Sequence, residues 1–389
     1  MTTTRTIRLS SHDNVVVAVD PIAPGAGSMF LLIAAMYWVG FGLIAFTLAR
    51  RSIWLALVLL LLALSPPAFV FIGILWRDVL FATTWLLSAA LAFAVADRDT
   101  KLRVPVQGLA LGLLALGVLL RPNALIAAPV LAATVLWPAQ FSWKRSAIIY
   151  VPAAVGLFGL VQVIYYGALG ATRQHPQQSI MVFDLGGISH FTRQNQFPVT
   201  WSEPESQMVL NGCYKPTEWD IYWRLEPCQF VMHKLEGEEK LFGTSAVPQA
   251  WAHAIMRHPI AYLEHRAAFM WNFLTGANLT MWVHDIDNLP NMPFADRPAF
   301  VAVKAIDDAL KPTPLLRAGS WLLLCIAVCG LACRRRDTPE GAFALGVCGS
   351  AAVYVLTFLA VGVASDFRYA YWAVLAGTVG AVALMRQRT

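Results

Sequence analysis

Long apolar runs separated by short charged clusters make up most of this 389-residue chain. A helix rises ~1.5 Å per residue, so about 20 apolar residues are needed to cross the ~30 Å hydrocarbon core of a bilayer. Nine runs reach or approach that length: residues 28–49, 52–74, 79–96, 104–120, 122–137, 146–168, 315–333, 341–363 and 369–385. The pattern therefore predicts an all-α polytopic membrane protein with about nine transmembrane helices.

A long segment of mixed polar and apolar sequence separates the sixth run from the seventh. We predict four regions: an atypical, disordered N-terminus at 1–27, six transmembrane helices at 28–168, a mixed periplasmic segment at 169–314 and three transmembrane helices at 315–389. The two shortest runs, 104–120 and 122–137, are expected to extend into the interface or to pack as a hairpin.

The periplasmic segment contains a helical pattern from Gln249 to Leu274 that Pro259 interrupts. Proline is well accepted at the first position of a helix, so a second helix is expected to begin there. Residues 261–274 predict a helix lying in the membrane interface, or alternatively a short extra span in a re-entrant pair. Farther upstream, Asp184-Leu-Gly-Gly predicts a turn.

Composition supports the membrane class. With 58% hydrophobic and 13% charged residues and a mean hydropathy of +0.58, the chain has too few charges to cover a soluble globule of its size. Membrane lipids are therefore expected partners. A net charge of +6 is compatible with nucleic acid binding, but Lys and Arg fall in short clusters between apolar runs. We predict no nucleic acid partner.

Basic clusters occur at every second end of the predicted helices, as the positive-inside rule requires of cytoplasmic ends. They are Arg50 with Arg51, Arg98 with Lys101 and Arg103, Lys144 with Arg145, Arg334 to Arg336, and Arg386 with Arg388. The short connections at the opposite ends carry only Arg77, Arg121 and Arg368. We predict a multi-pass protein of the bacterial inner membrane with a cytoplasmic C-terminus.

This orientation places Met1 outside, although residues 1–27 contain no apolar run of transmembrane length. We infer that the chain is truncated, or starts at a wrong codon, relative to a design with one more upstream helix. The alternative is a first helix that inserts unaided with its N-terminus outside.

Charged residues gather where three predicted outer turns leave the membrane. The turns contain Arg77 and Asp78, then Arg121, and finally Asp366, Arg368 and Tyr369. A charge at membrane depth costs ~2.5–3.5 kcal/mol on insertion scales, so such residues need a partner or a cavity. One guanidinium group can donate two parallel hydrogen bonds to two oxygens of a phosphate, which suits the binding of a lipid-linked phosphate. The alternative is that each arginine snorkels to the interface without a joint role.

Cysteine and histidine patterns add little further chemistry. Cys213 and Cys228 lie in the predicted outer segment and are a candidate disulfide of the kind that an oxidising compartment allows. The histidines are scattered without metal-binding spacing. We therefore predict no metal site and no cofactor, and leave a divalent metal open.

Four short motifs carry a family resemblance. They are Gly73-x-x-Trp76-Arg77-Asp78, Arg121-Pro-Asn123, His258-Pro-x-x-Tyr262-Leu-x-x-Arg266 and Ser365-Asp-Phe-Arg-Tyr369. Together they resemble a bacterial branch of the GT-C glycosyltransferases, similar to the protein mannosyltransferase and lipid A aminoarabinose transferase families. The resemblance implies transfer of a sugar from a polyprenyl-phosphate donor to an envelope glycan, lipid or protein acceptor on the outer face.

The resemblance also implies a role for each candidate residue. Asp78 would be the catalytic carboxylate, and Arg77, Arg121 and Arg368 would bind the lipid phosphate. Asp366 and Tyr369 would orient the last arginine or the sugar. The family begins with a helix and an acidic first outer loop that have no counterpart here, so enzymatic activity is left open. The alternatives are a transporter or flippase of lipid-linked sugars and a truncated, non-catalytic membrane protein.

Overall fold

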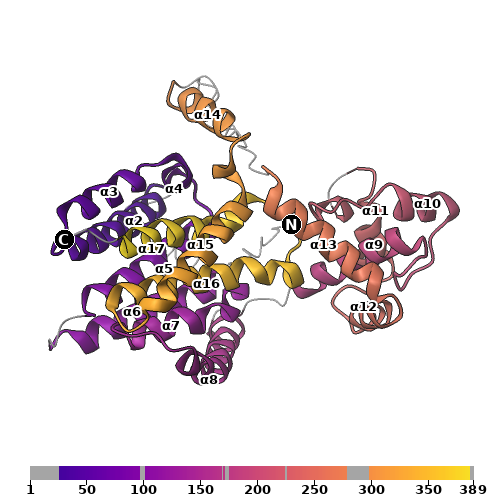
Figure 1. Ribbon diagram of the computed structural model, residues 1–389. Coiled ribbons are helices and arrows are strands. Elements are labelled where there is room, and N and C mark those ends of the chain that lie inside the picture. The colour runs from indigo at the N-terminus through magenta and orange to yellow at the C-terminus, as the bar shows by residue number, and fades with distance from the viewer. Residues whose placement is uncertain are drawn as a thin grey trace, which may run out of the picture. The chain divides into compact units, whose positions relative to one another are not determined.

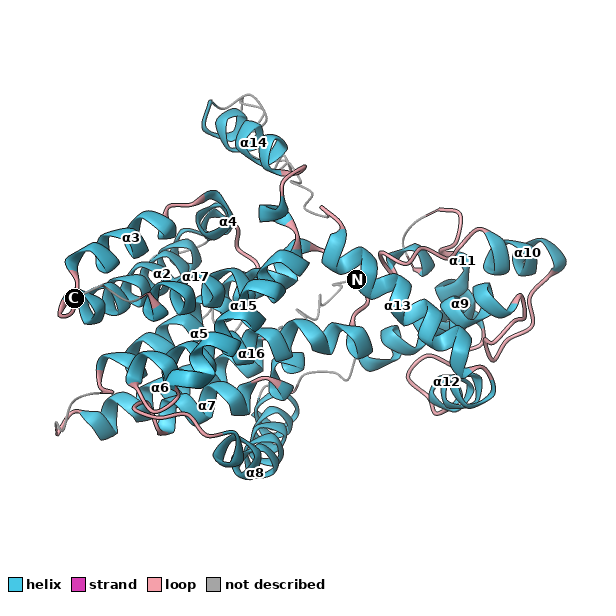
Figure 2. Cartoon of the chain, in the orientation of Figure 1, coloured by secondary structure: helices cyan, strands magenta, loops and turns pink. Residues whose placement is uncertain are grey.

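The structure is a computed structural model that describes residues 26–96, 101–168, 170, 175–223, 226–277 and 298–385. The named elements in these ranges are all helices (Figures 1 and 2). Several of them are long and apolar enough to cross a membrane. The predicted all-α, multi-pass class is therefore confirmed. Residues 1–25 of the expected disordered N-terminus lie outside the described residues, as do Arg98, Arg386 and Arg388.

Two compact units divide the chain, and each is described by itself. The first comprises Met1–Thr172, Leu279–Val355 and Phe367–Thr389. The second comprises Arg173–Asn278 and Leu356–Asp366. The first unit thus holds the apolar helices that flank the predicted periplasmic segment. The second holds most of that segment together with the end of the eighth predicted span.

Seven helices in the described ranges are long and apolar enough to cross a membrane. Three of these spans include an adjoining 3-10 or π-helical turn. They are α2 (Ala26–Ala49), α5 (Arg77–Ala94), α6 (Arg103–Leu120), α8 (Trp143–Val161) with η3 (Gln162–Ala168), α15 (Ala318–Ala332) with η8 (Cys333–Arg335), α16 (Pro339–Val361), and η9 (Phe367–Ala370) with α17 (Tyr371–Leu384). Two shorter elements, α14 (Pro298–Leu310) and η7 (Pro314–Leu316), precede α15.

The second predicted span, 52–74, is broken rather than straight. Helix α3 (Ile53–Ala63) is followed by α4 (Pro66–Phe69) and η1 (Val70–Gly73), and the two parts are bent by 65°. Pro66 and Pro67 cause the break, because neither can donate the backbone hydrogen bond that would continue α3. Counting this pair as one span brings the total in the described residues to eight.

The fifth predicted span, 122–137, is not a full-length helix, so the predicted count of nine is not confirmed. It consists of η2 (Pro122–Ile126) and α7 (Ala128–Leu136), and nearly all of α7 is buried. A short helix can be accommodated at this place because protein rather than lipid surrounds it. Gln107 near the start of α6 donates to the Val135 and Leu136 carbonyls, so α7 returns toward the end at which α6 begins.

Helix α5 is the centre of the first unit. It packs against α2, α6, α7 and α17, and most of its residues are buried. The indole of Trp85 donates to the Leu114 carbonyl at 3.2 Å, and its ring lies edge-on to Trp372. Gly117 provides the space for that ring, because a Cβ there would overlap it. Helix α5 therefore holds its first turn in a fixed position.

Contacts within the first unit sort the helix ends into two groups. Arg51 forms an ion pair with Glu340, the Phe141 amide donates to the Arg336 carbonyl at 2.8 Å, and Arg335 donates to the Leu384 carbonyl at 3.1 Å. All of these residues lie at ends that the charge pattern assigns to one side. Asp78, Arg121 and Arg368 come together at the opposite ends.

The second unit is built on α9 (Gln177–Thr192), α10 (Glu203–Asn211), α12 (Ala246–Arg257) and α13 (Pro259–Thr275). Shorter turns are η4 (Asp220–Tyr222), α11 (Phe230–Met232) and η5 (His233–Glu238). The predicted break at Pro259 is confirmed, since α13 begins with this proline. The predicted turn at Asp184 is wrong, because Gly186 and Gly187 lie inside α9. Cys213 and Cys228 form a disulfide.

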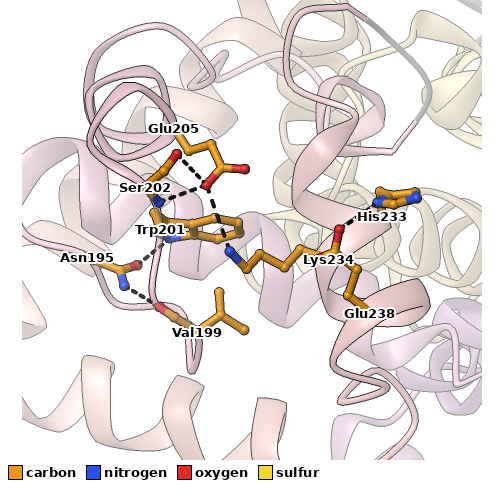
Figure 3. A network of polar contacts seen from close by, with 8 residues as sticks. All are labelled: Asn195, Val199, Trp201, Ser202, Glu205, His233, Lys234 and Glu238. Carbon is orange, nitrogen blue, oxygen red and sulfur yellow. Dashed lines mark hydrogen bonds and ion pairs between the residues drawn. The ribbon is translucent and has the colours of Figure 1, made fainter.

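A polar network orders the start of α10 (Figure 3). The Glu205 carboxylate accepts from the Ser202 amide and hydroxyl, which forms a capping box and holds the pKa of Glu205 below its usual value. Lys234 extends its ammonium toward this carboxylate across the face of Trp201. Asn195 accepts from the Trp201 indole at 2.9 Å, which closes the loop before α10.

Replacing Gly346 with alanine tests the packing of α16 on α7. The new methyl group would overlap Thr134, a short side chain that cannot swing away, so we expect a loss of ~1–3 kcal/mol in unfolding free energy. Gly108→Ala is the matched control, because a Cβ at that helical position has nothing within 4 Å. Thermal unfolding in detergent should show a lower midpoint for Gly346→Ala alone. Equal midpoints for the two variants would contradict this packing.

Candidate functional site

Asp78 lies in the first turn of α5, immediately after the extended residue Trp76 and the helix-starting Arg77. The positive end of a helix dipole favours a carboxylate at this position. Only 5% of the Asp78 side chain is exposed. A carboxylate buried this deeply requires compensating positive charge.

Arg121 supplies part of that charge from the C-terminal end of α6. Its guanidinium forms an ion pair with Asp78 Oδ2 and lies 5.1 Å from the centre of the Tyr369 ring. Pro122 follows directly and ends the regular helix. The local sequence thus ends α6 just before Arg121, the residue whose side chain reaches Asp78.

Arg368 reaches the same carboxylate from η9. Its Nε lies 3.9 Å from Asp78 Oδ2, its guanidinium stacks 4.5 Å above the Trp76 ring, and its Nη2 donates to the Tyr369 hydroxyl at 3.1 Å. We name Trp76, Asp78, Arg121, Arg368 and Tyr369 the Asp78 cluster. Three segments that are distant in sequence therefore meet at one carboxylate.

The charges and exposures of the Asp78 cluster favour anion binding. Two guanidiniums against one carboxylate give +2 − 1 = +1. The Arg121 and Arg368 side chains are 22% and 28% exposed, so both reach the surface while Asp78 does not. Both ion pairs use Oδ2, and Oδ1 is buried without a hydrogen-bond partner among the described residues. The cluster thus offers positive charge and one uncommitted carboxylate oxygen.

The contacts that define the Asp78 cluster do not involve two other predicted site residues, Arg77 and Asp366. Arg77 is exposed and, in the part of the chain that the structure describes, forms no ion pair with Asp78. Asp366 is the last residue of the second unit and is half-buried there. The structure therefore joins Asp78 with Arg121, Arg368 and Tyr369.

Sequence reasoning gave no role to two aromatic residues beside this carboxylate. Trp76 covers the Arg368 guanidinium, and Tyr354 of α16 is buried near enough to interact with the charges of Arg121 and Asp78. A tyrosine hydroxyl inside an apolar run is the signal that could have indicated Tyr354, because a buried hydroxyl needs a polar neighbour.

The second unit contains its own buried charges. Asp184 of α9 is fully buried, and its Oδ1 lies 2.6 Å from Arg266 and 3.1 Å from His265 Nε2, both on α13. Its Oδ2 accepts from the Trp251 indole of α12 at 2.7 Å. Arg266 also donates to the Gly362 carbonyl at 2.7 Å. These contacts join three helices around one carboxylate, and we interpret them as structural.

Both ring nitrogens of His265 have a polar neighbour, Tyr214 at Nδ1 and Asp184 at Nε2. Nδ1 lies 3.0 Å from the Tyr214 hydroxyl, and the ring packs against Phe183 and against the backbone of Gly187. Burial lowers the pKa of His265 below its ordinary value, and the neighbouring Asp184 carboxylate only partly opposes this effect. Burial also raises the pKa of the Tyr214 hydroxyl.

No group of three or more His, Cys, Asp or Glu side chains suited to a metal ion occurs among the described residues. Comparisons with protein families, with curated proteins and with solved structures find no match to this chain. The GT-C resemblance therefore rests on the motifs in the sequence.

Acidification should destabilise the second unit through His265. Its folded-state pKa lies below the ordinary value, so below pH ~6.5 the unfolded chain binds a proton that the folded chain does not. Stability is thus complete above that pH and falls beneath it, by at most ~1.4 kcal/mol per pH unit for one histidine. Thermal unfolding at pH 7.5, 6.5 and 5.5 measures this slope.

His265→Gln should reduce that slope, because glutamine does not titrate. The control is His253→Gln, which changes an exposed histidine on α12. Equal pH slopes for wild type and His265→Gln would show that another group is responsible.

Proposed function

We propose that this protein is a membrane glycosyltransferase that moves a sugar from a polyprenyl-phosphate donor to an envelope glycan, lipid or protein. The observation that carries the proposal is the Asp78 cluster, in which a buried carboxylate meets two surface-reaching guanidiniums at one end of a helical bundle. Guanidinium forks suit phosphate oxygens, and the bundle supplies an apolar setting for a polyprenyl chain.

In the proposed reaction, Arg121 and Arg368 bind the phosphate of the donor. The Asp78 carboxylate takes the proton of the acceptor hydroxyl while the acceptor oxygen bonds to the anomeric carbon. The bond from that carbon to the phosphate oxygen breaks, and polyprenyl phosphate leaves with its negative charge stabilised by the guanidiniums. Tyr369 holds Arg368 in place through its hydroxyl. Arg77, exposed at the same turn, is assigned a secondary role in phosphate binding.

The proposed location is the bacterial inner membrane, with the Asp78 cluster on the outer side and the C-terminus in the cytoplasm. Support comes from the charge pattern together with the sorting of helix ends. The basic clusters at Arg51 and at Arg335 to Arg336 share one end, and the Asp78 cluster lies at the other.

A transporter or flippase of lipid-linked sugars is the second candidate. It is favoured by the two guanidiniums of Arg121 and Arg368, which can bind a phosphate without any base. The two functions differ in what Asp78 does, and one substitution separates them.

Arg368→Ala should weaken binding of polyprenyl phosphate. Loss of a charge-assisted hydrogen bond is worth ~1.5–3 kcal/mol, or about ten- to hundredfold in affinity. Native mass spectrometry of the full chain in nanodiscs, with polyprenyl phosphate and with the phosphate-free polyprenol, measures the effect. Arg103→Ala is the matched control, since this residue starts α6 at the end opposite to Arg121. Unchanged binding by Arg368→Ala would remove this arginine from the site.

Asp78→Asn distinguishes the enzyme from the flippase. The amide keeps the shape of the carboxylate but cannot accept the proton, so sugar transfer from a radiolabelled polyprenyl-phosphate sugar should fall by ~10²–10⁴-fold. Binding of polyprenyl phosphate should persist, because the two arginines remain. Retained transfer would refute the base role, whereas retained transbilayer movement with no transfer by wild type would support the flippase.

A further inference from the structure

Helix α13 exposes a continuous apolar stripe. Ile260, Leu263 and Trp271 are 72%, 63% and 69% exposed, and the small residue Ala267 is exposed between them. Their spacing of three or four residues places all four on one face of the helix. The stripe extends over ~16 Å at ~1.5 Å per residue.

The opposite face of α13 is already in use. His265, Arg266, Phe269 and Phe273 point into the second unit and are buried there. The exposed stripe therefore needs an apolar environment of its own, because large exposed apolar side chains in a row are unfavourable in water. The stripe is therefore an interaction surface rather than an ordinary exposed face.

The neighbour of α13 identifies what that environment is. The last turns of α16 belong to the second unit, and Phe358 stacks on Phe273 with ring centres 5.0 Å apart. Phe269 packs against Gly362, whose carbonyl accepts from Arg266. Helix α16 is one of the helices suited to cross a membrane, so α13 is packed against the end of a spanning helix. A helix held at that end is suited to a position near the boundary of the bilayer.

We propose that the exposed stripe of α13 lies in the membrane interface, with Ile260, Leu263 and Trp271 inserted among lipid headgroups and upper acyl chains. A surface helix of this kind buries its apolar face ~5–10 Å into that boundary. Tryptophan is enriched at this depth because its ring is apolar and its N–H can meet water. Glu264, at the edge of the stripe, keeps its carboxylate in the headgroup layer. This inference does not depend on the proposed glycosyl transfer.

A bilayer fits this surface better than a protein partner does. The stripe is narrow and continues an element that already abuts a membrane-spanning helix, whereas a stable protein interface buries a broader patch with a polar rim. Docking of another protein or of a second copy is the competing outcome of the test.

Spin-label accessibility in the full chain tests the proposal. Leu263→Cys and Ile260→Cys, each labelled with a nitroxide in nanodiscs, place the probe on the stripe; Cys333 and Cys329 are replaced by serine to prevent labelling elsewhere. Gln207→Cys on α10, an exposed polar position of the same unit, is the matched control. Collisions with oxygen, which concentrates in lipid, and with a water-soluble nickel complex are measured.

We expect severalfold more oxygen than nickel collisions at both stripe positions and the reverse at the control. Nickel accessibility equal to that of the control would overturn the proposal by showing that water covers the stripe. Low accessibility to both reagents would also overturn it, because another protein surface would then cover the stripe. The size-exclusion profile and the intact Cys213–Cys228 disulfide verify that each labelled variant is folded.

Discussion

A buried carboxylate at the end of a membrane helix is stable only beside positive charge, and this requirement organises the candidate site. Asp78 is held by Arg121 at the end of α6 and by Arg368 in η9. The ion pairs fix three separate parts of the first unit relative to one another. Because Asp78 lies in the first turn of a helix that is packed on several sides, the positions of the arginines follow from the core of the bundle.

Much of this arrangement could be predicted from hydropathy and charge. The apolar runs predicted most of the long helices. The alternation of basic clusters predicted which helix ends lie on the same side of the bundle. The short fifth run was misjudged because run length does not reveal whether lipid or protein surrounds a helix, and α7 is buried in protein. Gly186 and Gly187 suggested a turn, yet they lie within α9 to give space to the side chains of Tyr222 and His265.

The candidate site was predictable only in part, for a physical reason. Helix ends on the same side of a membrane lie at a similar depth. The charge pattern therefore predicted that Asp78, Arg121 and Arg368 share one side. The distances between them within the plane of the membrane depend on which helices pack together, and hydropathy and charge do not reveal this. Arg77 adjoins Asp78 in the chain, but consecutive residues of a helix point in different directions, and it is Trp76 that contacts Arg368 instead.

The central place of α5 has a consequence for how this chain can change over evolution. A helix that touches other helices on most sides has few positions at which leucine, valine and phenylalanine are interchangeable, since each substitution alters the volume of a packed neighbour. Helices α2 and α3 each have one exposed side, where such exchanges leave the packing of the bundle unchanged. Divergent relatives should therefore keep α5 and change most on the exposed sides of α2 and α3, so that similarity would be concentrated in the buried helix rather than spread evenly over the chain.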